Sequence, residues 1–391
     1  MGRRLFVLGS FVATLAIAGA AEASWGTIGA GTGSAKASSI PPGSVPTHST
    51  TTYPNVALSW SPLSVGGAAV SYVVRRYSEA GSLQTIGAGC SGTLATSSCT
   101  ESSVPVGRWQ YTTQAAKANW VGLESAKSTT VEVAAPPTSV VCTNCHTYAR
   151  TGTVYINAAN QAAVQLQAVL PSTSLGTDTA NVVLTDSASH TATTSGPASA
   201  GSGTVTFPTL SSAALVDGAV TAGSYVTANT GDVSPTTSLA LVRDTVAPTG
   251  VDAVAANGGT ARQLDAGDTI TFTFSEPIDP ATVKSGWSGT STTVPVTFTN
   301  AGGNDTFTIG GTNLGTINTT ANYVMGTVTC AGSSMVASAG TVTVTLGACT
   351  GATHTGPPKG TAFFWPPSAA ITDFAGNPIS TAVVSGSQGG F

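Results

Sequence analysis

Residues 268–279 read Asp-Thr-Ile-Thr-Phe-Thr-Phe-Ser-Glu-Pro-Ile-Asp. One isoleucine and two phenylalanines alternate strictly with threonine, and this two-residue period puts the apolar side chains on one face of a β-strand. Asp279 then suits the N-cap of a short helical turn over residues 280–283, because Pro280 fits the first helical position. The stretch therefore predicts a half-buried strand followed by a capped turn.

The composition of the whole chain agrees with a β-rich fold. Charged residues make up 8% of the 391 residues, against about 25% in an average soluble protein. Threonine and valine, which favour strands over helices, are prominent. The 13 lysines and arginines form no cluster and the net charge is −4, so no nucleic-acid partner is expected.

The first residues predict an export signal. Arg3 and Arg4 precede an apolar run over residues 5–20, and Ala-Glu-Ala at 21–23 suits a signal peptidase, so cleavage is expected before Ser24. A twin-arginine route is the alternative. No later stretch holds the ~20 apolar residues of a membrane span. The mature protein is therefore expected to be secreted, either extracellular or associated with the cell surface.

Six cysteines in an exported chain predict three disulfides. The expected pairs are local ones: Cys90 with Cys99, Cys142 with Cys145, and Cys330 with Cys349. From loop-closure entropy, the first bridge is expected to stabilise the fold by about 2.7 kcal/mol and the last by about 3.3 kcal/mol. Each bridge should staple one domain, with no covalent link between domains.

Proline-marked seams divide the mature chain. A strand-like run ends just before Pro136, and another ends before the segment that leads to Pro248. We therefore expect three tandem immunoglobulin-like or fibronectin-type β-sandwiches. The predicted parts are a signal peptide at 1–23, a linker or N-terminal extension at 24–45, and sandwiches at 46–135, 136–246 and 247–391.

Residues 46–135 carry the landmarks of a known module. Trp60 ends a run of alternating apolar residues, and residues 107–115 read Gly-Arg-Trp-Gln-Tyr-Thr-Thr-Gln-Ala. This segment resembles a fibronectin type III domain, which implies that Trp60 is its inner-sheet tryptophan and Tyr111 its corner tyrosine. Residues at the family's spacing before the last strand are Asn119, Gly122 and Ser125. The cysteine pair in its middle loop departs from the family pattern.

The other two segments carry a different set of motifs. Asp-Thr-Val-Ala-Pro at 244–248 closes the second segment, and the third holds the strand at 268–279 and Thr-Asp-Phe-Ala-Gly-Asn-Pro at 372–378. Both segments resemble bacterial Ig-like domains of secreted surface and adhesin proteins. In the third segment the resemblance implies a signature strand, a short helix and a penultimate turn.

The sharpest chemical motif is Cys142-Thr-Asn-Cys145-His146, which has the C-x-x-C-H form of covalent haem attachment. A haem would need an axial ligand from elsewhere, and the candidates Met325, Met335 and His190 lie in no haem-pocket pattern. A disulfide that pins the start of the second sandwich is the favoured interpretation, and no cofactor is expected.

No catalytic set is found. The chain lacks the H-E-x-x-H, G-x-S-x-G and paired S-x-x-K motifs. Glu276 and Asp279 form a tight acidic pair, which is interpreted as part of a capped turn and not as a glycosidase dyad. The histidines are isolated in loops or seams: His48, His146, His190 and His354. We therefore expect no enzyme and no catalytic residue.

Metal and sugar sites were weighed on the remaining polar and aromatic residues. The candidates for calcium at the domain seams are Asp217, Asp232, Asp244 and Asp373. They show no dense D-x-D spacing and suit turns, so no metal is expected. The candidate rings for stacking on sugars are Trp120, Trp287 and Phe363-Phe364-Trp365, for which plugging of sandwich ends is the favoured interpretation.

The expected function is that of a secreted, non-catalytic structural or adhesive protein that presents β-sandwich modules outside the cell. The alternatives are a carbohydrate-binding accessory protein and, last, a c-type haem protein. A surface protein or a polysaccharide would be the partner, and self-assembly through an exposed strand edge is a variant. The sequence leaves four questions open: which ligand or partner is bound, whether the protein is a monomer or a fibre, whether calcium lies at the domain seams, and whether the protein is released or retained on the cell.

Overall fold

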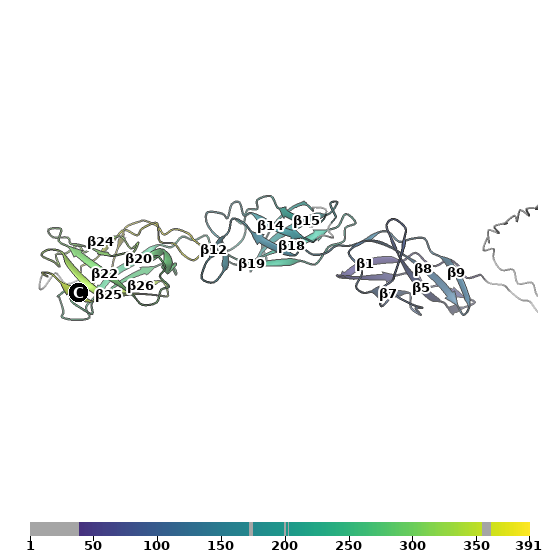
Figure 1. Cartoon of the computed structure of the whole chain (residues 1–391), viewed down its shortest axis with the longest axis horizontal. Helices are drawn as coiled ribbons and strands as arrows, with labels where there is room; N and C mark the ends of the chain where they lie inside the picture. Colours follow the sequence, from purple (N-terminus) through teal and green to yellow (C-terminus); the bar gives the residue numbers. More distant parts are fainter. Residues whose placement is uncertain (1–38, 172–174, 199–200, 202, 354–360) are drawn as a thin grey trace, which may run out of the picture. The chain divides into compact units, whose positions relative to one another are not determined.

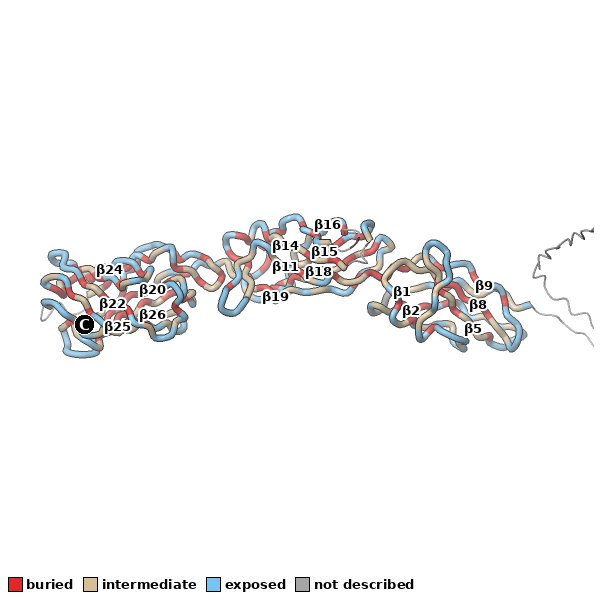
Figure 2. The backbone as a smooth tube through the Cα atoms, viewed as in Figure 1, coloured by how far each residue is buried: buried red, intermediate tan, exposed pale blue. Residues whose placement is uncertain are grey.

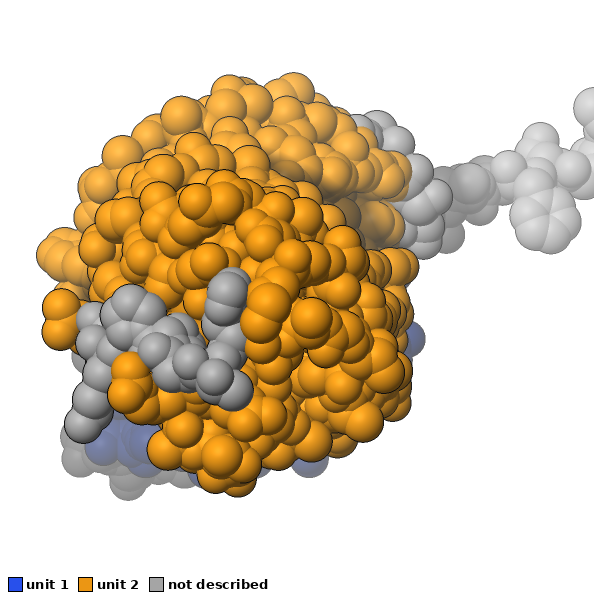
Figure 3. All heavy atoms as spheres, turned by 90° about the vertical axis from the view of Figure 1, so that its left-hand side faces the viewer, with its two compact units in different colours: residues 1–133 blue, residues 134–391 orange. Residues whose placement is uncertain are grey.

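The computed structural model describes residues 39–171, 175–198, 201, 203–353 and 361–391 (Figure 1). The predicted signal peptide, most of the predicted linker and His354 lie outside these residues. The chain divides into two compact units, Met1–Val133 and Ala134–Phe391, which Figure 3 colours separately. Both are built almost wholly of β-strands, and the described residues contain one helix, α1 (Pro280–Val283). The predicted all-β sandwich fold is confirmed.

Two antiparallel sheets form the N-terminal unit. One has the order β1-β2-β7, and the other has the order β10-β8-β5-β6, with β9 paired to β8. A two-stranded hairpin, β3-β4, stands apart from both. The bounds are β1 Thr47–Thr52, β2 Asn55–Ser59, β3 Ser64–Val65, β4 Ala68–Ala69, β5 Ser71–Ser78, β6 Leu83–Gln84, β7 Ser98–Glu101, β8 Gly107–Lys117, β9 Trp120–Glu124 and β10 Val131–Val133.

The core of this unit follows from alternation along its strands. In β5 the residues facing the core, among them Tyr72 and Val74, alternate with half-exposed ones. Trp60 is 6% exposed and packs edge-on against Tyr72, with ring centroids 5.4 Å apart. Tyr111 is fully buried, and its hydroxyl donates to the carboxylate of Glu101. Both landmark aromatics therefore lie in the core.

The C-terminal unit begins with a sandwich of two sheets, here called the middle sandwich. Their orders are β11-β14-β17 and β12-β13-β19-β18-β15-β16, and β13 pairs with β19 in parallel. The bounds are β11 Ser139–Cys142, β12 His146–Tyr148, β13 Thr153–Ile156, β14 Leu166–Leu170, β15 Thr179–Asp186, β16 Thr191–Pro197, β17 Gly203–Thr206, β18 Gly218–Thr227 and β19 Thr237–Arg243. Alternating Leu166, Ala168 and Leu170 are buried, as their spacing predicts.

A ten-stranded sheet, here called the C-terminal sandwich, completes the unit. Its order is β20-β21-β26-β25-β22-β23-β24-β28-β29, with β27 on β25. The bounds are β20 Gly250–Ala256, β21 Thr269–Phe274, β22 Thr292–Thr299, β23 Thr306–Ile309, β24 Thr316–Asn318, β25 Val328–Ser338, β26 Thr341–Thr345, β27 Ala348–Thr350, β28 Phe364–Trp365 and β29 Val384–Ser385. The boundaries drawn at 135/136 and 246/247 stay predictions.

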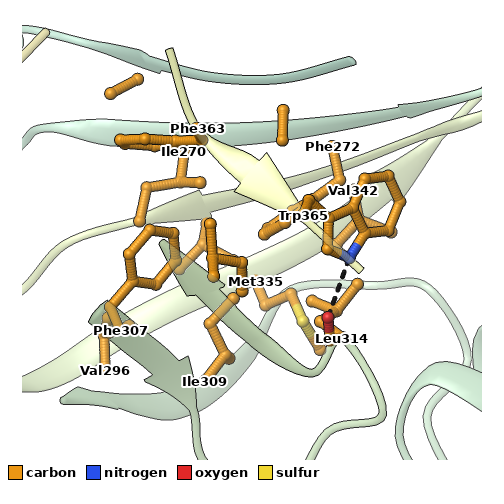
Figure 4. Packing of buried hydrophobic residues seen from close by; sticks show 14 of the residues in the cluster. Ile270, Phe272, Val296, Phe307, Ile309, Leu314, Met335, Val342, Phe363 and Trp365 are labelled. Atoms are coloured by element: carbon orange, nitrogen blue, oxygen red, sulfur yellow. Dashed lines mark hydrogen bonds between the residues drawn. The ribbon is translucent and has the colours of Figure 1, made fainter. Parts of the chain in front are cut away.

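The stretch quoted first contains β21, which pairs with β20 and β26. In β21, Ile270, Phe272 and Phe274 are buried while the threonines between them are half-exposed, and Figure 2 shows such alternation along the strands. Phe272 packs against Trp365 within the apolar cluster of Figure 4. The Asp279 carboxylate accepts a hydrogen bond from the Ala281 amide, so the predicted N-cap is present.

The six cysteines form three disulfides, Cys90–Cys99, Cys142–Cys145 and Cys330–Cys349. Each joins residues that are close in sequence, with separations of 9, 3 and 19. The sulfurs of Cys142 and Cys145 are therefore bonded to each other and not open for thioether bonds to a haem. No helix in the described ranges has the length and apolar character to cross a membrane.

Candidate functional site

Three carboxylates meet in the C-terminal unit, at the seam between its two sandwiches. Asp244 directly follows β19, Glu276 follows β21, and Asp373 lies in the turn that precedes Pro378. One oxygen from each lies within 4.8 Å of the others. Asp373 is 2% exposed, whereas Asp244 and Glu276 are half-buried. We call these three residues the seam cluster.

Asn377 holds the turn of Asp373 against the end of β19. Its backbone amide and its side-chain amide donate to the two oxygens of Asp373, both at 2.8 Å. The side-chain amide also donates to the backbone carbonyl of Asp244 at 2.9 Å, and its Oδ1 accepts from the Ala158 amide at 2.9 Å. Asn377 is 1% exposed, so one buried side chain bonds to groups of both sandwiches.

Further contacts surround this joint. The side-chain amide of Asn157 donates to the Ala375 carbonyl at 2.8 Å, and Tyr148 packs on Phe374 with ring centroids 4.8 Å apart. Gly376 has a φ of +82°, and a Cβ there would lie 2.9 Å from the His146 ring. Glycine is therefore required twice, by the left-handed backbone and by the close approach of the imidazole.

Burial and like charge perturb the acids of the seam cluster. Burial first, then the charges of Asp244, Asp373 and Asp217, raise the pKa of Glu276 from 4.5 to about 7. Burial and the charge of Asp373 likewise raise the pKa of Asp244. The Oε1 atom of Glu276 is buried and has no hydrogen-bond partner among the described residues. The cluster therefore stores electrostatic repulsion that a proton on Glu276 relieves.

The donor set suits a hard cation as well as a proton. Carboxylate oxygens are ligands that Ca²⁺ prefers, but Ca²⁺ takes six to eight oxygens, and the cluster offers one from each of three side chains. Backbone carbonyls or water would have to supply the others. The geometry therefore defines an acidic joint between two sandwiches and no complete cage.

The sequence candidates for calcium separate into two groups. Asp244 and Asp373 come together, but Asp217 forms an ion pair with Arg243 at 2.5 Å and Asp232 accepts from Thr230. Glu276 joins the first two instead of pairing with Asp279, which caps α1. The sequence analysis missed this grouping because its members come from separate parts of the chain. The turn motifs at 244–248 and 372–378 were the only signal.

The histidines within the described ranges each contact a neighbouring element. His48 lies 3.1 Å from the Thr129 hydroxyl, and the His190 ring lies 2.9 Å from Asp186. His146 is in β12 and lies against Gly376. These histidines are not brought together, and His146 faces the seam turn beside the Cys142–Cys145 bridge.

The candidate sugar-stacking rings divide between core and surface. Trp287, Phe363 and Trp365 are at most 5% exposed, as their interpretation as end plugs predicts. Trp120 is 62% exposed and Phe364 is 44% exposed. Trp120 lies within strand β9, which pairs with the end of β8. The two exposed rings therefore belong to different units.

Comparison with known proteins does not show which family the chain belongs to. No protein-family model matches it, and neither does any curated protein. A crystal structure of the chicken CNTN1 FN1-FN3 domains is similar over 89% of this chain and 99% of that chain, at 10% identity and a TM-score of 0.23. Likeness at this level says nothing about what the chain binds. The fold itself defines the class of protein, which is an all-β chain of sandwiches.

The seam cluster makes the stability of the C-terminal unit depend on pH. Glu276 is protonated in the folded state and ionised in the unfolded state between pH 4.5 and about 7. The folded state binds more protons there, so the free energy of unfolding should fall as pH rises through this window and stay low above it. Chemical denaturation of the full chain at several pH values, in EDTA to exclude cations, measures the slope.

Variants assign the slope to one residue. In Glu276→Gln, the free energy of unfolding should change less with pH between 4.5 and 7. At pH 8 this variant should be more stable than the wild type. Asp279→Asn is the matched control, because it keeps an N-cap oxygen and lies outside the seam cluster. A Glu276→Gln profile with the wild-type slope would show that another group titrates.

Proposed function

We propose that the protein is an exported, non-catalytic structural or adhesive protein whose sandwiches act as joined modules outside the cell. The export signal predicted at 1–23, the low charge and the three local disulfides support this proposal. The partner is a surface protein or a polysaccharide. Catalysis is not part of the proposal, since the sequence lacks the motifs of the common hydrolases.

The observation that carries the proposal is the bonded joint between the middle and C-terminal sandwiches. Linked domains move relative to each other by default unless their interface is substantial. Here buried amides of Asn157 and Asn377 cross the seam, and the Arg150 guanidinium donates to the Ser288 carbonyl at 2.5 Å. A chain built to transmit position or force needs such joints, whereas a flexible tether does not.

Asn377→Ala tests the joint. The substitution leaves the Ala158 amide and the Asp244 carbonyl without their partner, so the free energy of unfolding of the C-terminal unit should drop by about 1–3 kcal/mol. Residues 244–248 should become the first site of limited proteolysis, because the end of β19 loses its anchor. Calorimetry and mass spectrometry of the digest measure the two effects.

Asn181→Ala is the control in the same unit. Its amide bonds to Thr227 and Thr179 on the middle sandwich, far along the chain from the seam motifs. Its protease pattern should match that of the wild type. Equal patterns for Asn377→Ala and the wild type would remove the support that the joint gives to a structural function.

A further inference from the structure

An open groove lies on the outer face of the six-stranded sheet of the middle sandwich. In β18 the residues at 220, 222, 224 and 226 point into the core, so those at 219, 221, 223 and 225 face outward. The groove follows these outward residues and their neighbours on β15 and β19, and its volume is about 520 Å³. Ligand sites commonly measure about 300–1,000 Å³.

Gly223 makes the hollow. It pairs with Val183 on β15 and with Ser238 on β19. The middle residue of this row across three strands therefore has no side chain. Tyr225 and Thr221 lie on either side of Gly223 along the outward face of β18. A Cβ on Gly223 would come 2.9 Å from the Thr236 methyl, so a larger residue at this position would crowd Thr236.

The groove presents hydroxyl groups that the protein does not use. Its lining includes six hydroxyl-bearing residues, and in the part of the chain that the structure describes none of these hydroxyls has a hydrogen-bond partner. They are Thr185, Ser187, Thr221, Tyr225, Thr236 and Ser238. Methyl groups of Val183 and Ala219 lie among them. The lining is therefore amphipathic, with free hydroxyls beside apolar patches.

The groove presents no available charge. Asp186 is its one acidic lining residue, and its carboxylate accepts from the amides of Ala188, His190 and Val216 and faces the His190 ring. Burial opposes its ionisation, but these hydrogen bonds together lower the pKa of Asp186 to about 2. The negative charge of Asp186 is thus bonded to groups of its own turn and to the Val216 amide, and it is not available to a ligand. No basic residue lines the groove to attract an anion.

We propose that this groove binds a segment of a neutral polysaccharide. A sugar ring has an apolar C–H face and a rim of hydroxyls, which are the two chemistries of the lining. Tyr225 supplies the phenol ring that can contact the sugar face, and the free hydroxyls around Gly223 bond to the rim. The inference deepens the function proposed above and rests on it, because it selects the polysaccharide from the two partner classes and assigns it to one face of one sandwich.

Affinity electrophoresis of the full chain tests the groove. Native gels contain a soluble β-1,3-glucan, dextran or a galactomannan, and an alginate gel serves as the charged comparison. At least one neutral polysaccharide should slow the wild type, and alginate should not. Tyr225→Ala and Gly223→Val, which remove the ring and fill the hollow, should each weaken that affinity at least about tenfold.

Trp120→Ala is the matched control, because it removes an exposed aromatic ring from the other unit. It should bind like the wild type. Thermal unfolding checks that each variant is folded, and Tyr225→Ala alone decides the result if Gly223→Val does not fold. The proposal is overturned if no neutral polysaccharide slows the wild type, if Tyr225→Ala binds unchanged, or if Trp120→Ala abolishes binding. None of these outcomes bears on the seam test with Asn377→Ala.

Discussion

Glu101→Gln is expected to lower the free energy of unfolding of the N-terminal unit by about 3–5 kcal/mol. Glu101 is fully buried at the end of β7, and its Oε1 accepts from the Arg76 guanidinium at 2.8 Å and from the Gly87 amide at 2.6 Å. Arg76 is itself 6% exposed. Removing the negative charge therefore leaves a buried guanidinium without its counter-ion.

The hydroxyl of Tyr111 adds to the effect. It donates to Oε2 of Glu101 at 2.7 Å, and burial together with the Glu101 charge raises the pKa of Tyr111, so the phenol remains a donor. The glutamine amide can place an N–H where an acceptor was needed. The tyrosine that marks the fibronectin resemblance thus depends on a carboxylate that is buried with it.

A second ion pair in the same unit provides the control. Arg108 and Glu79 lie 3.0 Å apart, but the Glu79 side chain is 54% exposed, and such pairs contribute about 0–1 kcal/mol. Glu79→Gln should therefore unfold close to the wild type in urea. A loss below about 1 kcal/mol for Glu101→Gln would show that the Arg76–Glu101 pair does not govern this core.

Trp365→Ala is expected to destabilise the C-terminal sandwich by about 3–5 kcal/mol. The indole is fully buried and packs edge-on against Phe272 and Phe274, with ring centroids 5.0 and 5.3 Å away. It donates a hydrogen bond to the Leu314 carbonyl at 2.8 Å (Figure 4). Alanine would leave a cavity beside two phenylalanines and an unpaired carbonyl. Calorimetry of the full chain should show a lower transition temperature.

The neighbouring Phe364 gives a control within the same two-residue strand. Its side chain is 44% exposed, so Phe364→Ala should change the free energy of unfolding by no more than about 0.5 kcal/mol. Similar losses for both variants would mean that β28 itself, and not the indole, accounts for the effect.

Apolar alternation predicted several of the strands that have one buried face. In β21 and β14 the apolar residues alternate with polar ones, and the period alone identifies strand and inward face. Strand β16 was not predicted, because its exposed and half-exposed residues include no buried side chain and give no apolar period. Its partner β15 fixes it through backbone pairing, which leaves no sign in the residue types.

The seam cluster shows the same limit for side chains. Asp244 and Asp373 were recognised as turn residues near a seam, which local motifs can show. Their meeting with Glu276 depends on how two sandwiches pack, and no spacing in the sequence encodes that. The groove at Gly223 was missed for a related reason, since an outward glycine is meaningful only beside the strands that flank it.

The three disulfides have a mechanical consequence. Residues enclosed between two bridged cysteines cannot extend when the chain is pulled. Here the bridged cysteines are only 9, 3 and 19 residues apart. An extended chain gains about 3.3–3.6 Å per residue released. Under tension, an unfolded sandwich can therefore extend to nearly its full contour length. The bridges restrict only small loops and leave most of the chain free to extend.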